Sequence, residues 1–96
     1  MIGAFVRFQF GADFNAGKLR VIADKARGKF EGMPGLISKT FTLDAERRAA
    51  VNFYVWESEQ VARRFFSDAM LEQVAGLYGV KPTLEFVEIA QRVDNA

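Results

Sequence analysis

The sequence predicts an α+β fold in which helices cover one face of a four-stranded antiparallel sheet. Several segments alternate between the two sides of a strand, and two longer segments repeat apolar residues every three or four positions, as amphipathic helices do. Along the chain the order is strand, helix, strand, strand, helix, strand, which is the split βαβ or ferredoxin-like arrangement. We expect a single domain of this kind over residues 1–96.

The first strand is expected over residues 2–10 and the first helix directly after it. One face of the strand is wholly apolar, with Ile2, Ala4, Val6, Phe8 and Phe10. Asp13 or Asn15 is the expected cap of the helix, whose lysine and arginine side chains form a solvated face. Gly32, Pro34 and Gly35 end the helix in a sharp turn.

The second and third strands form a predicted hairpin around the charged segment 44–49. In "LISKTFTL", residues 36–43, one side of the strand carries Ile37, Lys39, Phe41 and Leu43. We expect an edge strand here, because Lys39 and the Ser/Thr row tolerate water. The third strand is expected from Ala49 to Trp56.

A second helical region is expected after Ser58, its predicted cap. The apolar stripe changes phase near residues 67–70, so we expect a kink or break there, with Asp68 as a second cap. Gly76 and Gly79 are expected to close this region. The last strand is expected over residues 81–93.

Composition excludes several classes of function. The chain carries 13 Lys and Arg against 12 Asp and Glu, a net charge of +1, so we expect no nucleic-acid partner. It contains neither Cys nor His, which removes Cys-His and Ser-His nucleophiles and the usual zinc ligands, and we expect no metal. No apolar run is long enough to span a bilayer, so we expect no membrane partner and a cytoplasmic location.

The segment "NFYVWE", residues 52–57, has no plain solvent face, because Asn52, Tyr54 and Trp56 alternate with two further apolar residues. Two helices can cover only one face of the sheet, and the apolar face of residues 2–10 is the natural choice. The other face would then hold Phe5, Arg7 and part of the Tyr54 and Trp56 pair. Such residues are enriched in protein interfaces, so we infer a homodimer joined through the sheets.

The segment "MPGLISKTFTLDAERRAAVNFYVWESEQVARRFF", residues 33–66, resembles the antibiotic-biosynthesis monooxygenase superfamily of dimeric α+β barrels. More closely, the chain is similar to YdhR-like monooxygenases. The positions in step with that group are Phe8 and Phe10, Pro34-Gly35, Tyr54 with Trp56, the Glu59 region and Gly79-Val80. The resemblance covers nearly the whole chain, although the fold also serves isomerases, haem degraders and ligand-binding proteins.

The resemblance implies oxygenation of a small phenolic or quinoid compound without metal, haem or flavin, so no cofactor is expected. In such chemistry the substrate passes an electron to oxygen, and the protein removes a proton, stabilises the anion and excludes water. The axial histidine of haem-degrading members is missing, which excludes that activity. With no His anywhere, the base is expected to be Tyr54, a carboxylate such as Glu57 or Glu85, or the substrate's own acidity.

The candidate catalytic residues are Tyr54, Trp56, Asn52 and Arg7. Tyr54 and Trp56 would stack on the substrate and donate hydrogen bonds, or they are interface or core aromatics. Asn52 would orient the substrate, or it caps a strand pair. Arg7 would stabilise an anion, or it forms a salt bridge across the dimer with an acidic residue of the last strand, Glu85 or Glu88.

The candidate pocket residues are Phe65, Phe66 and Tyr78. The two phenylalanines would line a pocket or fill the core, and Tyr78 would close the pocket's open end or lie on the surface. Two rival functions use the same fold. One is a dimeric ligand-binding or stress-associated protein without turnover, and the other is a lactone or enol isomerase, which needs an acid-base pair but no oxygen.

Overall fold

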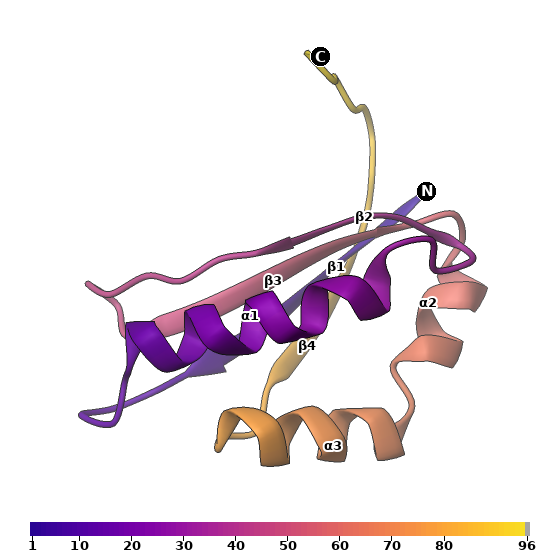
Figure 1. Ribbon diagram of the computed structural model, residues 1–96. Coiled ribbons are helices and arrows are strands. Elements are labelled where there is room, and N and C mark those ends of the chain that lie inside the picture. The colour runs from indigo at the N-terminus through magenta and orange to yellow at the C-terminus, as the bar shows by residue number, and fades with distance from the viewer. Residues whose placement is uncertain (96) are drawn as a thin grey trace.

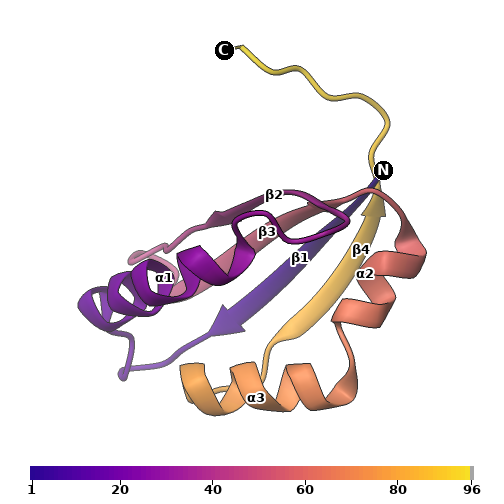
Figure 2. The ribbon, with the colours of Figure 1, turned by 45° about the vertical axis from the view of Figure 1, so that its right-hand side comes forward.

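The computed structural model describes residues 1–95 and confirms the predicted fold class. Its elements are β1 (Ile2–Gln9), α1 (Ala16–Phe30), β2 (Leu36–Phe41), β3 (Ala49–Trp56), α2 (Glu59–Phe65), α3 (Asp68–Tyr78) and β4 (Thr83–Glu88). The strands form one antiparallel sheet in the order β2-β3-β1-β4. Helices α1 and α3 lie on the same side of this sheet and diverge from one another (Figures 1 and 2). Within residues 1–95, no helix is long and apolar enough to cross a membrane.

Side-chain caps fix the starts of the helices. The Oδ1 atom of Asn15 accepts a hydrogen bond from the Lys18 backbone N–H at 3.0 Å, and Ser58 caps α2 in the same way. The predicted break in the second helical region is confirmed, because α2 ends and α3 begins anew after it. The cap of α3 is Ser67, whose Oγ accepts from the Met70 N–H at 3.2 Å, so the prediction of Asp68 as this cap is wrong.

Two glycines hold turns that other residues would strain. Gly35 has φ +84°, and a Cβ there would lie 2.5 Å from Cγ1 of Val61, so the turn before β2 packs directly on α2. Gly79 ends α3 with φ +84° and donates its N–H to the Ala75 carbonyl at 2.8 Å. Gly76 lies inside α3 and does not close it, contrary to prediction.

A β-bulge changes which residues of β2 share a face. Leu36 pairs opposite Trp56, but the register shifts between Leu36 and Ser38, so Ile37 is the extra residue and is 40% exposed. Lys39 lies opposite Tyr54. The strand is at the edge of the sheet as predicted, but Lys39 is partly buried, with its amine over rings on the helix-covered side.

The last strand is shorter than predicted. It ends at Glu88, because Glu88 lies opposite Ile2, the first residue of β1, and no further strand residue remains for pairing. Residues 89–95 lead away from the sheet (Figures 1 and 2).

The core lies between the helices and one face of the sheet. Tyr54 and Trp56 belong to this covered face and are 4% and 1% exposed, so the prediction that part of this pair lies on the uncovered face is wrong. The reason is register: Tyr54 lies opposite Ala4, and Trp56 opposite Ile2. Residues opposite one another in an antiparallel pair point to the same side, so β3 follows the apolar face of β1.

Candidate functional site

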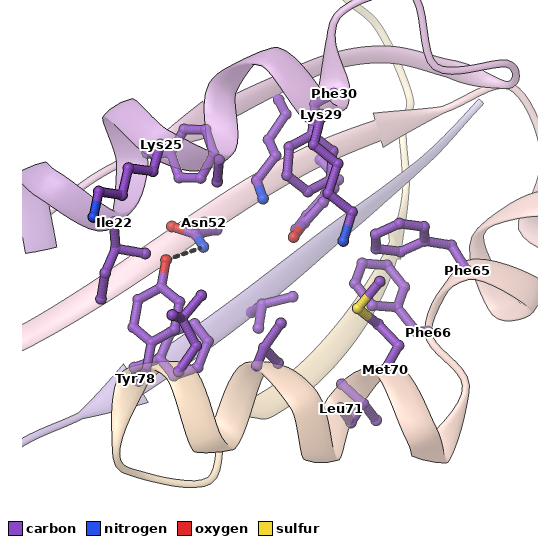
Figure 3. Close-up of a pocket in the computed structure, with 18 of the residues that line it drawn as sticks. Ile22, Lys25, Lys29, Phe30, Asn52, Phe65, Phe66, Met70, Leu71 and Tyr78 are labelled. Carbon is purple, nitrogen blue, oxygen red and sulfur yellow. Dashed lines mark hydrogen bonds between the residues drawn. The ribbon is translucent and has the colours of Figure 1, made fainter.

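A cavity of about 470 Å³ lies between α1, α3 and the covered face of the sheet. In Figure 3, Ile22 and Phe30 of α1 form one wall, Met70 and Leu71 of α3 form the opposite wall, and Asn52 of β3 lies between them. The lining is mainly aliphatic and aromatic, with a few polar groups. Both the size and this lining are typical of sites for small organic molecules.

A hydrogen-bonded pair marks one end of the cavity. Asn52 is 3% exposed, and its Nδ2 donates to the Tyr78 hydroxyl at 3.2 Å (Figure 3). The Tyr78 ring stacks on Phe8 with centroids 3.7 Å apart. Burial raises the pKa of Tyr78, although the Asn52 hydrogen bond lowers it. Tyr78 therefore remains a neutral phenol, held on two sides.

Lys39 lies over aromatic rings in the same cavity. Its Nζ is 3.5 Å from the ring centroid of Phe30, 4.1 Å from that of Phe41 and 4.4 Å from that of Tyr54. The ring faces stabilise an ammonium ion, whereas burial and the charge of Lys29 disfavour it. Burial dominates and, with Lys29, lowers the pKa of Lys39 to about 7. A large share of Lys39 is therefore a free amine near neutral pH, and a free amine can accept a proton.

Tyr54, Phe65 and Phe66 complete the aromatic lining. The Tyr54 ring meets Phe66 edge to face at 4.9 Å between centroids, and both phenylalanines line the cavity, as does Tyr54. Burial raises the pKa of Tyr54, and Tyr78 raises it further. Tyr54 is thus protonated at neutral pH and can donate a hydrogen bond, which argues against Tyr54 as the base.

The structure brings five of the seven predicted site residues to one cavity, and leaves Trp56 and Arg7 outside its lining. Trp56 lies behind Tyr54, with parallel rings 5.8 Å apart, and its buried Nε1 has no hydrogen-bond partner within residues 1–95. Arg7 lies on the opposite face of the sheet, where it donates to Gln9 Oε1 at 3.0 Å.

Neither of the carboxylates suggested as a base, Glu57 and Glu85, lines the cavity, and both are exposed. Over residues 1–95, no group of three or more His, Cys, Asp or Glu side chains is placed to hold a metal ion. The polar chemistry of the lining therefore comes from amide, phenol and amine groups.

Sequence reasoning missed the lysines of the site. Lys39 lies on the same side of the predicted strand as Phe41 and Leu43. A single charged residue among apolar ones could have indicated that its side chain faces the interior. Lys18, Lys25 and Lys29 also line the cavity, although they are expected on the solvated face of α1. Their spacing of seven and four residues, which puts them on one side of a helix, was the second signal.

No family model matches the chain, and no curated protein matches it in sequence. Solved structures do match in fold. A monooxygenase from the gene ActVA-Orf6 of Streptomyces coelicolor, solved with the ligand nanaomycin D, has a TM-score of 0.72 and 23% identity, covering 99% of this chain and 92% of its own.

Two further structures agree in fold at lower identity. Rv0793 from Mycobacterium tuberculosis has a TM-score of 0.70 and 15% identity, covering 97% of this chain and 98% of its own. SnoaB, a cofactor-independent oxygenase from Streptomyces nogalater, has a TM-score of 0.69 and 15% identity, covering 98% of this chain and 97% of its own. At these identities the likeness establishes a shared fold.

Proposed function

We propose that the protein is a cofactor-independent monooxygenase of small phenolic or quinoid compounds, related to the YdhR-like group. The observation that carries the proposal is a lysine amine with its pKa near 7, placed over aromatic rings inside an apolar cavity. A general base works best when its pKa lies near the operating pH. Two proteins of the same fold are described as a monooxygenase and as a cofactor-independent oxygenase, which supports this choice among rival functions.

In the proposed reaction, the substrate supplies the electrons. The free amine of Lys39 takes the acidic proton of a phenol or of its keto tautomer, and the resulting ammonium stabilises the anion. The anion passes an electron to O₂, the two radicals combine to a peroxide anion, and the Lys39 ammonium returns its proton to give the hydroperoxide. With an anthrone, loss of water from the peroxide leaves a quinone, so one oxygen atom enters the product and the other leaves as water.

The other polar groups of the cavity would hold the substrate in place. Tyr54 is protonated and can donate to an oxygen of the substrate, and Asn52 retains a second N–H beside the one it gives to Tyr78. Phe65 and Phe66 would pack on the substrate rings and exclude water. Trp56 would act only from behind, by supporting the Tyr54 ring.

Oxygen uptake tests the proposal. The purified, metal-free protein is mixed with anthrones, quinols and catechols in an oxygen electrode, with Lys39→Met beside the wild type and Lys81→Met as the matched control, since Lys81 is exposed and outside the cavity. We expect catalysed uptake that Lys39→Met lowers at least tenfold, as general bases typically contribute more than that, and that Lys81→Met leaves unchanged.

Other results of this experiment favour the rival functions. Substrate conversion without oxygen consumption would support the lactone or enol isomerase. Tight binding of these aromatics with neither uptake nor conversion would support the non-catalytic ligand-binding or stress-associated protein. Uptake that is unchanged in Lys39→Met would keep the oxygenase and reject Lys39 as its base.

We also propose that the protein is a homodimer joined through the uncovered face of the sheet. Phe5 is 37% exposed on that face, its ring lies 4.7 Å from Phe53, and Arg7 lies beside them on β1. Aromatic residues and Arg are enriched at interfaces. Light scattering is expected to give twice the monomer mass for the wild type and the monomer mass for Phe5→Glu, and a monomeric wild type at micromolar concentration would reject the dimer.

A further inference from the structure

The charged groups that line the cavity are all positive. They are the amines of Lys18, Lys25, Lys29 and Lys39, and no Asp or Glu belongs to the lining. The whole chain, in contrast, is almost neutral at +1. The cavity therefore gathers one sign of charge in an otherwise balanced molecule, and low-dielectric walls strengthen the field of such a cluster.

The helix α1 arranges three of these lysines in a row. Lys18, Lys25 and Lys29 lie on the side of α1 that also carries the cavity residue Ile22, and all three are exposed. Within residues 1–95 no ion pair involves any of them, because Glu31 pairs with Arg27 at 3.5 Å instead. These amines are thus free to meet a ligand.

Lys29, at one end of the row, lies near Lys39 of β2. Burial is the larger cause of the lowered pKa of Lys39, and the charge of Lys29 lowers it further. Two like charges beside an apolar cavity repel one another, and a negative group placed between them would relieve that repulsion. Figure 3 shows Lys25 and Lys29 on the same helix, with Tyr78 across the cavity at the end of α3 and Asn52 of β3 between the two helices.

We propose that the cavity selects aromatic anions, with the apolar rings of the ligand between α1 and α3 and its carboxylate or phenolate directed toward the amines of Lys25, Lys29 and Lys39. This inference rests on the proposed function for the identity of the site, but it concerns binding and not turnover. Neutral aromatics of the same shape would enter the cavity with weaker affinity. Cationic ones would be rejected, because no negative group lines the cavity to receive them.

The test compares ligands that differ only in charge. Isothermal titration calorimetry at neutral pH and low salt measures the Kd of 2-naphthoate, 2-naphthamide and 2-naphthylmethylammonium. We expect naphthoate to bind about tenfold more tightly than naphthamide, since two exposed charges each contribute up to about 1 kcal/mol. This advantage is expected to shrink as salt is added, because salt screens exposed charges.

The double variant Lys25→Gln/Lys29→Gln identifies the source of the preference. We expect it to lose most of the naphthoate advantage and to keep the Kd of naphthamide, since glutamine is as good a helix former as lysine. The matched control Arg64→Gln/Lys81→Gln removes two positive charges that lie outside the cavity lining and are exposed. It is expected to retain the advantage, and circular dichroism checks that both variants remain folded.

Three outcomes overturn the inference: equal binding of naphthoate and naphthamide, a preference that Lys25→Gln/Lys29→Gln leaves intact, and no binding of either ligand. Its failure and that of the proposed function are distinguishable. Oxygen uptake with neutral quinols and no preference for naphthoate would reject the anion selectivity alone. A naphthoate preference carried by the lysines, without uptake by any substrate, would reject the oxygenase alone.

Discussion

On the covered side of the sheet, Val6 and Phe8 are 2% and 1% exposed, whereas Phe5, their neighbour on the other side of the same strand, is 37% exposed. Both faces are built from one alternating sequence, and both carry aromatic residues. They differ in what lies over them: α1 and α3 cover one face and diverge above it (Figure 2). The cavity lies in the space between these helices and the sheet.

The polar groups of the two faces also differ in their partners. On the covered face Asn52 donates a hydrogen bond to Tyr78, and the Lys39 amine lies over three rings. Both polar side chains therefore contact aromatic residues. On the uncovered face Arg7 bonds to Gln9, and Gln9 bonds to a backbone carbonyl at 2.7 Å. The covered face therefore carries polar groups that point into a cavity and have shifted pKa values, whereas the uncovered face is an ordinary apolar surface with a polar edge.

The largest expected effect is the loss of unfolding free energy when a phenylalanine is truncated on the covered face rather than on the uncovered face. Phe8→Ala removes a fully buried ring that stacks on Tyr78, and we expect it to lower the free energy of unfolding by about 3–5 kcal/mol. Phe5→Ala, the matched truncation on the uncovered face, is expected to cost the monomer under about 1.5 kcal/mol, because Phe5 is already partly hydrated. Urea unfolding measured by circular dichroism compares the two.

The same two unfolding free energies are expected to depend differently on protein concentration. If a second copy covers Phe5, the cost of Phe5→Ala grows with protein concentration, because association stabilises the folded state by mass action. The loss of unfolding free energy caused by Phe8→Ala is expected not to change with protein concentration, because Phe8 lies in the core of one subunit. Equal costs for both substitutions in a proven monomer would contradict the assignment of the two faces.

The next effect is a dependence of stability on pH that comes from Lys39. Its folded pKa of about 7 lies below the ordinary value of 10.5, so between these values the unfolded chain binds more protons. The free energy of unfolding therefore rises with pH above about 7, by about 2 kcal/mol up to about pH 9. Below about pH 7 both states are protonated, and this dependence disappears.

The variant Lys39→Met tests the source of that dependence. We expect its unfolding free energy to be flat over the same pH window and higher than that of the wild type at neutral pH, because no charge is buried. Lys81→Met, an exposed control, is expected to keep the wild-type slope. The tyrosines Tyr54 and Tyr78 do not interfere, since burial raises their pKa values above the ordinary 10.0. A slope that survives in Lys39→Met would assign it to another group.

Much of the fold could be predicted because local chemistry and tertiary packing agree. Asn15 and Ser58 cap the helices as expected, and β3 has the predicted bounds. The errors arise where a neighbouring element decides. The bulge at Ile37 depends on pairing with β3, and the end of β4 depends on where β1 begins, and neither is encoded in the segment itself.

The candidate site was predictable only in part: Asn52, Tyr54 and three further residues of the lining were named from the sequence, but its lysines and its location were not. Alternation grouped Asn52 with Tyr54 correctly, but only the β1–β3 register shows that this group faces the helices. The importance of Lys39 follows from rings contributed by α1 and β3, which are distant in sequence. A lysine in an apolar row can be recognised in the sequence, but the shift of its pKa depends on which residues surround it in the folded protein.

A smaller effect is expected from the pair of Asn52 and Tyr78. Asn52→Leu keeps the volume but removes the buried hydrogen bond to Tyr78, and we expect a loss of about 1 kcal/mol in unfolding free energy. Adding Tyr78→Phe in a double-mutant cycle is expected to give a coupling energy of similar size. On the uncovered face, Arg7→Leu breaks an exposed hydrogen bond and is expected to cost under about 0.5 kcal/mol. No coupling between Asn52 and Tyr78 would show that their contact contributes nothing to stability.

The smallest effect is expected at Trp56, although this side chain is almost fully buried. Trp56 is 1% exposed, but its Nε1 has no hydrogen-bond partner among residues 1–95. Trp56→Phe loses part of an aromatic ring and at the same time removes a buried unsatisfied N–H, and these opposite terms leave a change under about 1 kcal/mol. A loss above about 2 kcal/mol in urea unfolding would contradict this. It would mean that the indole N–H is satisfied in solution and that this part of the covered face admits a polar group behind Tyr54.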